Sequence, residues 1–169
     1  LRFISHHDEL RMLARALTRA GWPIAYSQGF NPQPRLTLPL PRSVGVASAC
    51  EWAVVELNEA QAVEKLRESL AATLPTGCDL QHLVALATRA TPHPRRALYT
   101  VELEPEHATH LGPRLAEVLA AKTLTIERSS APGKPSRTID IRPYIETLTL
   151  EGRTLSMRLA FMAQRTARP

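Results

Sequence analysis

The sequence contains one helix whose two ends are both marked, and this helix constrains the fold most. Ser5 stands at the N-cap position, and Asp8 follows three residues later in the spacing of a capping box. Gly21 can close the helix in a left-handed conformation, and Pro23 prevents it from resuming. We therefore expect the chain to turn after Gly21 and to pack this helix against other elements.

The predicted helix has two different faces. One face is apolar at helical spacing and consists of Leu10, Leu13, Ala14 and Leu17. Another face carries an arginine every four residues, at Arg11, Arg15 and Arg19. The apolar face predicts burial in a core. The arginine stripe predicts either a track for a polyanion or an ordinary solvated helix face.

The elements around this helix place the first half of the chain in the α+β class. Short apolar stretches at 1–5, 23–27, 51–57 and 78–87 predict strands, and 35–40 extends the second of them. A capping pair, Asn58 and Gln61, precedes a second amphipathic helix whose apolar residues are Val63, Leu66, Leu70 and Leu74. The order β-α-β-β-α-β is typical of a ferredoxin-like domain, with both helices on one face of a four-stranded antiparallel sheet. We assign this domain to residues 1–88.

The second half is predicted to be a related α+β domain. Residues 89–96 hold two prolines and three arginines and predict a linker, so the second domain spans residues 97–169. Its helix, 105–122, directs Leu111, Leu115, Val118 and Leu119 inward, and Pro113 either begins that helix or kinks it. Strands are predicted on both sides of the helix, with a turn at 130–136, and the β-rich ending forms a hairpin at Glu151–Gly152.

Charge and cysteine content narrow the class of protein. The net charge is +5 and the pI is near 9.8, with an excess that is mostly arginine, the residue best suited to bidentate contact with phosphate. Cys50 and Cys78 form neither a disulfide framework nor a metal motif, so we expect reduced thiols in a cytoplasmic protein. No apolar run approaches the ~20 residues of a membrane span. No motif of a known enzyme class appears, so we expect no metal, no cofactor and no catalysis by this chain alone.

The stretch SQGFNPQPR, Ser27 to Arg35, is the first candidate binding site. Gly29 can adopt a positive φ at no steric cost, and Pro32 and Pro34 fix their own φ and hold their neighbours extended. The loop is therefore expected to be stiff, and a stiff loop loses less conformational entropy when it binds.

The side chains of this loop suit nucleic acid if they are exposed. Phe30 would stack on a base, Gln28 and Asn31 would pair with polar base edges, and Arg35 would contact a phosphate. The alternative is that Phe30 packs into the core and the prolines only turn the chain.

His6 is the second candidate, because it lies in the first turn of the helix beside His7. A helix N-terminus attracts anions and lowers the pKa of a histidine, so His6 could serve as a general base next to a phosphate. The alternative is a capped helix end with two partly exposed histidines. As a metal site the pair is poor, since adjacent residues diverge on a helix and no third ligand is spaced to join them.

Four stretches carry a resemblance to a known family: FISHHD, RALTRAGWPIAYSQGFNPQPR, LPLPRSVGV and IDIRPYI. Together they resemble the radical SAM-linked protein family, a bacterial domain of unknown function that is fused to a radical SAM protein or encoded beside one. In the family pattern His6 matches a histidine, whereas His7 replaces an apolar residue and Gln33 replaces a histidine. The resemblance implies a radical SAM partner. Radical SAM enzymes need three cysteines for their iron–sulfur cluster, so the radical chemistry would not reside in this chain.

Three hypotheses of function follow. The first is a non-catalytic recognition module that holds RNA, with tRNA as one candidate, for a radical SAM enzyme; its contacts would be His6, Arg11, Arg15, Arg19, Gln28, Phe30, Asn31 and Arg35. The second is a metal-independent endoribonuclease that uses His6, in weaker architectural resemblance to CRISPR repeat-RNA endonucleases. The third is an adaptor that binds only protein.

Overall fold

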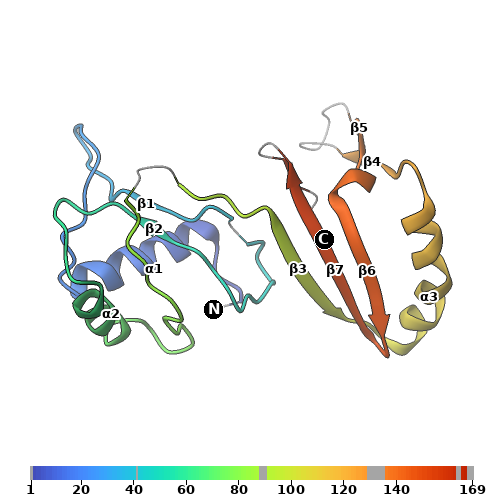
Figure 1. Ribbon diagram of the computed structural model, residues 1–169, viewed down its shortest axis with the longest axis horizontal. Coiled ribbons are helices and arrows are strands. Elements are labelled where there is room, and N and C mark those ends of the chain that lie inside the picture. The colour runs from blue at the N-terminus through green and yellow to red at the C-terminus, as the bar shows by residue number, and fades with distance from the viewer. Residues whose placement is uncertain (1, 41, 88–90, 129–135, 163–164, 167–169) are drawn as a thin grey trace. The chain divides into compact units, whose positions relative to one another are not determined.

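The computed structural model of the protein describes residues 2–40, 42–87, 91–128, 136–162 and 165–166. The chain divides into two compact units, Leu1–His93 and Pro94–Pro169, called here the N-terminal and the C-terminal unit (Figure 1). Both units combine helices with antiparallel strands. The predicted α+β class is therefore confirmed.

The first helix of the N-terminal unit, α1 (His6–Arg19), has the ends that the sequence predicts. The Ser5 hydroxyl accepts a hydrogen bond from the Asp8 amide at 3.2 Å and donates one to the Asp8 carboxylate at 2.6 Å. Gly21 has φ +71°, and the Trp22 amide donates to the Leu17 carbonyl at 3.1 Å. This bond closes the helix in a Schellman motif, for which the left-handed glycine is required.

The core of this unit lies between α1 and the second helix, α2 (Val63–Ala71). Its buried members are Ala16, Leu17, Trp22, Ile24, Leu66 and Leu70. Trp22 also donates its indole N–H to the Ser69 hydroxyl at 3.2 Å, so the one polar atom of its ring is satisfied.

The strands of the N-terminal unit are short. β1 (Leu36–Thr37) pairs antiparallel with β2 (Val54–Val55). Single bridges join Ile24 to Leu57 and Tyr26 to Pro34. The predicted segments 23–27, 35–40 and 51–57 thus do pair with one another, but regular ladder structure is limited to two residues in each strand.

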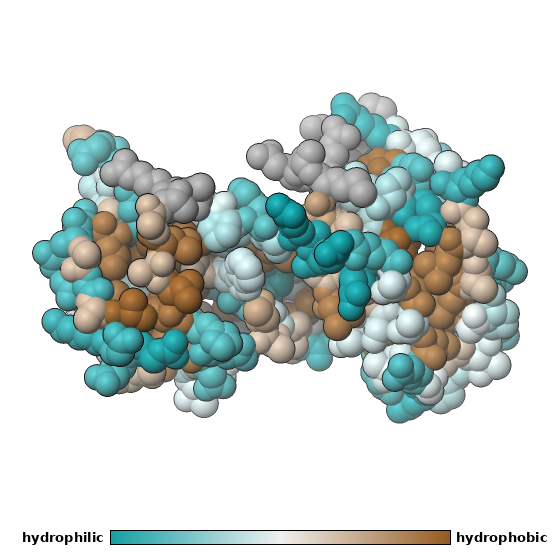
Figure 2. Space-filling model, viewed as in Figure 1, coloured by the Kyte–Doolittle hydropathy of each residue, from teal (hydrophilic) through white to brown (hydrophobic). Residues whose placement is uncertain are grey.

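The described residues of this unit do not show the ferredoxin-like β-α-β-β-α-β order. Residues 2–5 form a turn and irregular chain, and 78–87 form no strand. Leu80 and Leu83 pack partly buried against the core, whereas Val84 and Leu86 are 72% and 50% exposed, so the apolar pattern of 78–87 reflects partial packing and not strand pairing. In Figure 1 this green segment crosses the viewed face of the unit, and Figure 2 shows hydrophobic residues gathered on that face.

The predicted cap of the second helix is also wrong. The N-cap of α2 is Ala62, which makes no side-chain capping bond. Asn58 instead donates to the Ile24 carbonyl at 3.1 Å, and Gln61 donates to the Glu59 carboxylate at 2.9 Å. Asn58 therefore makes a tertiary hydrogen bond to Ile24 in place of the predicted local cap.

The C-terminal unit is built on an antiparallel sheet in the order β3-β7-β6. Its strands are β3 (Arg96–Glu102), β6 (Ile145–Glu151) and β7 (Thr154–Met162), and β8 (Arg165–Thr166) pairs with the end of β7. β4 (Thr125–Arg128) pairs with β5 (Arg137–Asp140), and the 3-10 helix η1 (Arg142–Tyr144) leads into β6. The third helix, α3 (Pro105–Ala120), lies beside β6 (Figure 1).

Most predictions for this unit are confirmed. Most residues of α3 are exposed. The four residues predicted to face inward are half-buried: Leu111, Leu115, Val118 and Leu119. The helix begins at Pro105, so the alternative that it begins at Pro113 is wrong. The hairpin turns at Gly152, with φ +60°, between paired Glu151 and Thr154. The turn predicted at 130–136 lies outside the described residues except for Ser136.

Arg142 connects α3 to the sheet. Its guanidinium donates to the carbonyls of Leu119 at 2.7 Å, Ala121 at 3.1 Å and Ile145 at 2.8 Å. Leu119 is in the last turn of α3, where carbonyls have no partner within the helix. Arg142 thus supplies donors that the helix end lacks, and it fixes this end against the start of β6.

Candidate functional site

The candidate loop is the end of a β-hairpin, residues 27–33, which we call the finger. At its base the Ser27 amide donates to the Gln33 carbonyl at 2.8 Å, and the Gln33 amide donates to the Ser27 hydroxyl at 2.9 Å. One step further from the tip, the Arg35 amide donates to the Ala25 carbonyl at 2.8 Å. Gly29 has φ +134°, a value that side-chain-bearing residues rarely adopt. These bonds hold the base of the finger, and the stiffness expected from Gly29, Pro32 and Pro34 stays a prediction.

Phe30 is fully exposed at the tip of the finger, with a relative exposure of 109%. Gln28, Asn31 and Gln33 are exposed as well. In Figure 1 the finger is the blue hairpin that projects away from α1 and α2, and in Figure 2 it is mostly hydrophilic. The alternative in which Phe30 packs into the core is wrong, because its side chain is fully exposed.

Arg35 stands at the foot of the finger and already has an ionic partner. Its guanidinium lies 3.0 Å from the Glu56 carboxylate, and both side chains are partly exposed, at 47% and 37%. An exposed pair of this kind contributes little and is screened by salt. Arg35 can therefore turn to a phosphate, but it must release or share Glu56.

The arginine stripe of α1 is exposed along its length, and its three members differ in their partners. Arg11 pairs with Asp8 at 3.5 Å, and Arg19 donates to the Thr73 carbonyl at 2.8 Å. Arg15 makes no hydrogen bond or ion pair with any residue that the structure describes. Arg15 is thus the member of the stripe most available to an anion.

The basic excess of the chain is not concentrated in the unit that carries the finger. Residues 1–93 hold nine Lys or Arg against eight Asp or Glu, a net of +1, whereas 94–169 hold twelve against eight, a net of +4. The arginines before residue 43 meet acidic residues from 43–88 once the unit folds, as the pairs Arg35–Glu56 and Arg42–Glu51 show. Folding thus neutralises part of the positive charge that these arginines carry.

His6 lies in the first turn of α1 and is half-buried. Its Nδ1 atom is buried and has no hydrogen-bond partner among the described residues. The nearest ring is that of His7, with centroids 5.8 Å apart. A ligand could therefore reach His6 only through atoms of the ring other than Nδ1, beside the N-terminus of α1.

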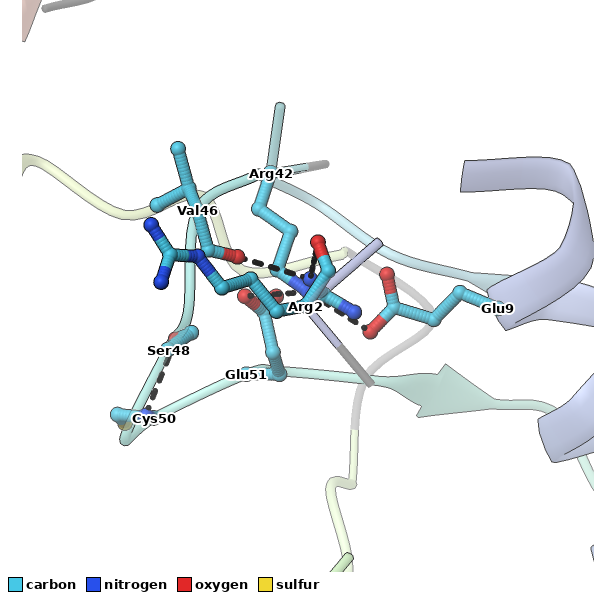
Figure 3. Close-up of polar contacts among 7 residues, drawn as sticks. All are labelled: Arg2, Glu9, Arg42, Val46, Ser48, Cys50 and Glu51. Carbon is cyan, nitrogen blue, oxygen red and sulfur yellow. Dashed lines mark hydrogen bonds and ion pairs between the residues drawn. The ribbon is translucent and has the colours of Figure 1, made fainter. Parts of the chain in front are cut away.

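A buried ionic cluster, which the sequence did not predict, lies near the start of α1 (Figure 3). Glu9 on α1 is only 6% exposed, and its carboxylate lies 3.4 Å from Nε of Arg42. The same nitrogen lies 3.7 Å from the Glu51 carboxylate. Arg42 also donates to the carbonyls of Val46 at 2.9 Å and Arg2 at 3.5 Å. One arginine therefore joins the chain start, α1 and the segment before β2.

The cluster holds two carboxylates against one guanidinium, and this imbalance affects proton binding. Burial raises the pKa of Glu51 above its usual value, and repulsion from Glu9 acts in the same direction. A hydrogen bond with Ser48 and attraction to Arg42 act in the opposite direction but do not cancel the effect. No local pattern could have predicted this cluster, because its members are far apart in sequence and charged residues usually indicate solvent.

Other kinds of site find no support in the parts of the chain that can be described. Within 2–40, 42–87, 91–128, 136–162 and 165–166, no group of three His, Cys, Asp or Glu side chains is arranged to hold a metal ion. No helix in those same ranges is long and apolar enough to cross a membrane.

The fold and the finger define a two-unit α+β protein with an exposed, braced hairpin as its most distinctive surface feature. Residues 1–169 match the sequence model of the family DUF2344, which is described as an uncharacterized protein conserved in bacteria. The chain therefore belongs to this bacterial family. A search of curated proteins and a search of solved structures each returned no match.

Proposed function

We propose that this chain is a recognition module that binds RNA and has no radical chemistry of its own. The observation that carries the proposal is Phe30, a phenylalanine at 109% relative exposure on the tip of a braced hairpin. Phe30 is the most exposed large hydrophobic residue among those the structure describes, and it stands at a hairpin tip between exposed amides, where a base can reach its ring. Bases stack on aromatic rings, and this contribution is tolerant of sequence.

The surroundings of the ring support RNA over a purely apolar ligand. Exposed amides at Gln28 and Asn31 flank it, and each offers both donors and acceptors to a base edge. Arg35 at the foot of the finger and Arg15 on α1 are exposed cations that can meet phosphates. The net charge of +5 adds a general attraction for polyanions.

The proposed partner is a radical SAM protein, fused to this chain or separate from it. This part of the proposal depends on the resemblance of the stretches around residues 3–8, 15–35 and 38–46 to radical SAM-linked proteins. In such an arrangement the chain would hold the substrate RNA, and the partner would supply the iron–sulfur chemistry.

A titration of fluorescently labelled RNA, followed by anisotropy at several salt concentrations, tests the proposal. We expect binding that weakens as salt rises. We also expect the Arg15→Gln variant to make the slope of log K against log salt shallower by about 0.7, the value for one phosphate contact on single strands. Arg114→Gln, which removes another exposed charge, from α3, is the matched control and should leave the slope unchanged. Absence of binding, or binding that does not respond to salt, would refute the proposal.

A protein-binding adaptor is the second candidate, and one observation favours it. The finger itself carries no charged residue, and Arg35, Arg11 and Arg19 each have a partner within the chain. An uncharged hairpin with an apolar tip also suits a pocket on another protein. Co-purification with the radical SAM protein that survives nuclease but is lost in Phe30→Ala, together with no affinity for RNA, would establish the adaptor instead.

A further inference from the structure

The finger has a shape that limits which form of RNA can reach its tip. Two antiparallel segments form its sides, and main-chain hydrogen bonds between positions 27 and 33 and between 25 and 35 hold them together. Paired segments of this kind lie about 4.8 Å apart before side chains are added. Phe30 sits alone at the end, because its neighbours in the finger are amides, a glycine and a proline.

A regular RNA duplex offers no surface on which this ring can stack. Each base in a duplex is covered above and below by its neighbours, and the major groove of A-form RNA is too deep and narrow for side chains to read. The wide minor groove displays sugar hydroxyls and base edges, but no open base face. Phe30 can reach a free base face only where a nucleotide lies outside a helix.

The residues next to the ring indicate what else is recognised. Residues 27–34 contain no charged side chain, so the tip itself is not built to neutralise phosphate. The amides of Gln28 and Asn31 match the donors and acceptors of an unpaired Watson–Crick edge, which a paired base does not present. Contacts with phosphate would be made by arginines outside the finger, such as Arg35 and Arg15.

We infer that the finger recognises an unpaired nucleotide, in a loop, a bulge or a single strand, by stacking its base on Phe30. This inference rests on the proposed function and specifies its ligand. Stacking requires a flat aromatic ring, whereas insertion into an apolar pocket requires only an apolar side chain. The two modes are therefore separated by replacing the phenylalanine with an aromatic or with an aliphatic residue.

The test uses the full chain and an RNA hairpin in which 2-aminopurine replaces either one loop base or one stem base. Wild-type protein should change the fluorescence of the loop probe and leave the stem probe unchanged. Phe30→Trp should keep the effect, while Phe30→Leu and Phe30→Ala should abolish it and weaken binding about 5- to 150-fold, the range for one stacked base. The matched control is Phe3→Ala, which removes another exposed phenylalanine of the same unit, at 76% exposure, and should bind like wild type.

The outcomes separate this inference from the function on which it rests. If no RNA binds, the proposed function fails and the inference fails with it. If RNA binds but a perfect duplex competes as well as the hairpin, RNA recognition stands and the unpaired-nucleotide inference is overturned. If Phe30→Leu binds and reports like wild type, the ring does not stack, and the inference is overturned in the same way.

Discussion

Removing the guanidinium of Arg42 should strongly destabilise the N-terminal unit. The change Arg42→Met keeps much of the side-chain length but leaves two carboxylates, Glu9 and Glu51, without their shared cation. The Arg42 side chain is 9% exposed, and the side chains of Glu9 and Glu51 are 8% and 28% exposed, so solvent can only partly replace the lost partner. Breaking a buried ion pair from one side costs about 3–5 kcal/mol. That is a large share of the 5–15 kcal/mol typical of a whole protein of this kind.

The penalty should depend on pH, and its sign follows from the pKa of Glu51. Burial and Glu9 raise this pKa in the folded unit, so the folded state holds a proton more tightly than the unfolded chain does. Stability from this group is therefore complete below the unfolded value of 4.5 and falls as pH rises through the higher folded value. Without Arg42 the pKa rises further, so the variant should be penalised less near pH 5 than near pH 7.5.

Urea unfolding followed by tryptophan fluorescence measures this directly. Both tryptophans of the chain, Trp22 and Trp52, belong to the N-terminal unit, so the signal reports that unit. Arg67→Met is the control: it removes a half-buried arginine whose one hydrogen bond to the described residues goes to the Gln81 carbonyl at 3.3 Å, and it should cost about 1 kcal/mol or less.

If Arg42→Met proves too unstable to study, the double variant Glu9→Gln/Arg42→Met can be used to test the same electrostatic cost. It removes one of the two uncompensated charges and should recover part of the lost stability. A penalty for Arg42→Met no larger than that of the control, or equal at both pH values, would refute the account of the buried cluster.

Three further changes probe other parts of the fold. Gly21→Ala should lower the unfolding free energy in urea by about 1–2 kcal/mol, because φ +71° is unfavourable for a residue with a Cβ; an unchanged value would contradict the Schellman closure of α1. Arg142→Met should lower the stability of the C-terminal unit by about 1.5–3 kcal/mol and speed amide hydrogen exchange in 105–120, since three carbonyls lose a charged donor; unaltered exchange would show that Arg142 does not hold α3. Phe30→Ala should change the unfolding free energy by less than about 0.5 kcal/mol, because the ring is fully exposed; a loss above about 1 kcal/mol would show that it packs.

Elements defined by local chemistry could be predicted from the sequence. The ends of α1 follow from Ser5 and Gly21, and the turn of the second hairpin follows from Gly152, because each residue determines the backbone next to it. Strand pairing in the N-terminal unit could not be predicted in this way. Whether 78–87 joins a sheet depends on which segment lies beside it, and its apolar pattern is equally consistent with packing Leu80 and Leu83 onto helices.

The candidate site was predicted in the same uneven way. Gly29, Pro32 and Pro34 predict a stiff finger, but they could not predict the exposure of Phe30, because that depends on the rest of the fold. The arginines were visible in the sequence, whereas their partners, such as Glu56 for Arg35, come from distant segments. The buried cluster of Glu9 and Arg42 was missed for the same reason: two charged residues 33 positions apart give no signal of contact.

Ultraviolet crosslinking of the full chain to RNA, followed by identification of the crosslinked peptide, tests the central claim most directly. We predict a crosslink within 20–35, the tryptic peptide that contains the finger, and its loss in Phe30→Ala but not in Phe3→Ala. RNA that crosslinks only to peptides outside 20–35, or a crosslink within it that persists without the Phe30 ring, would contradict the account.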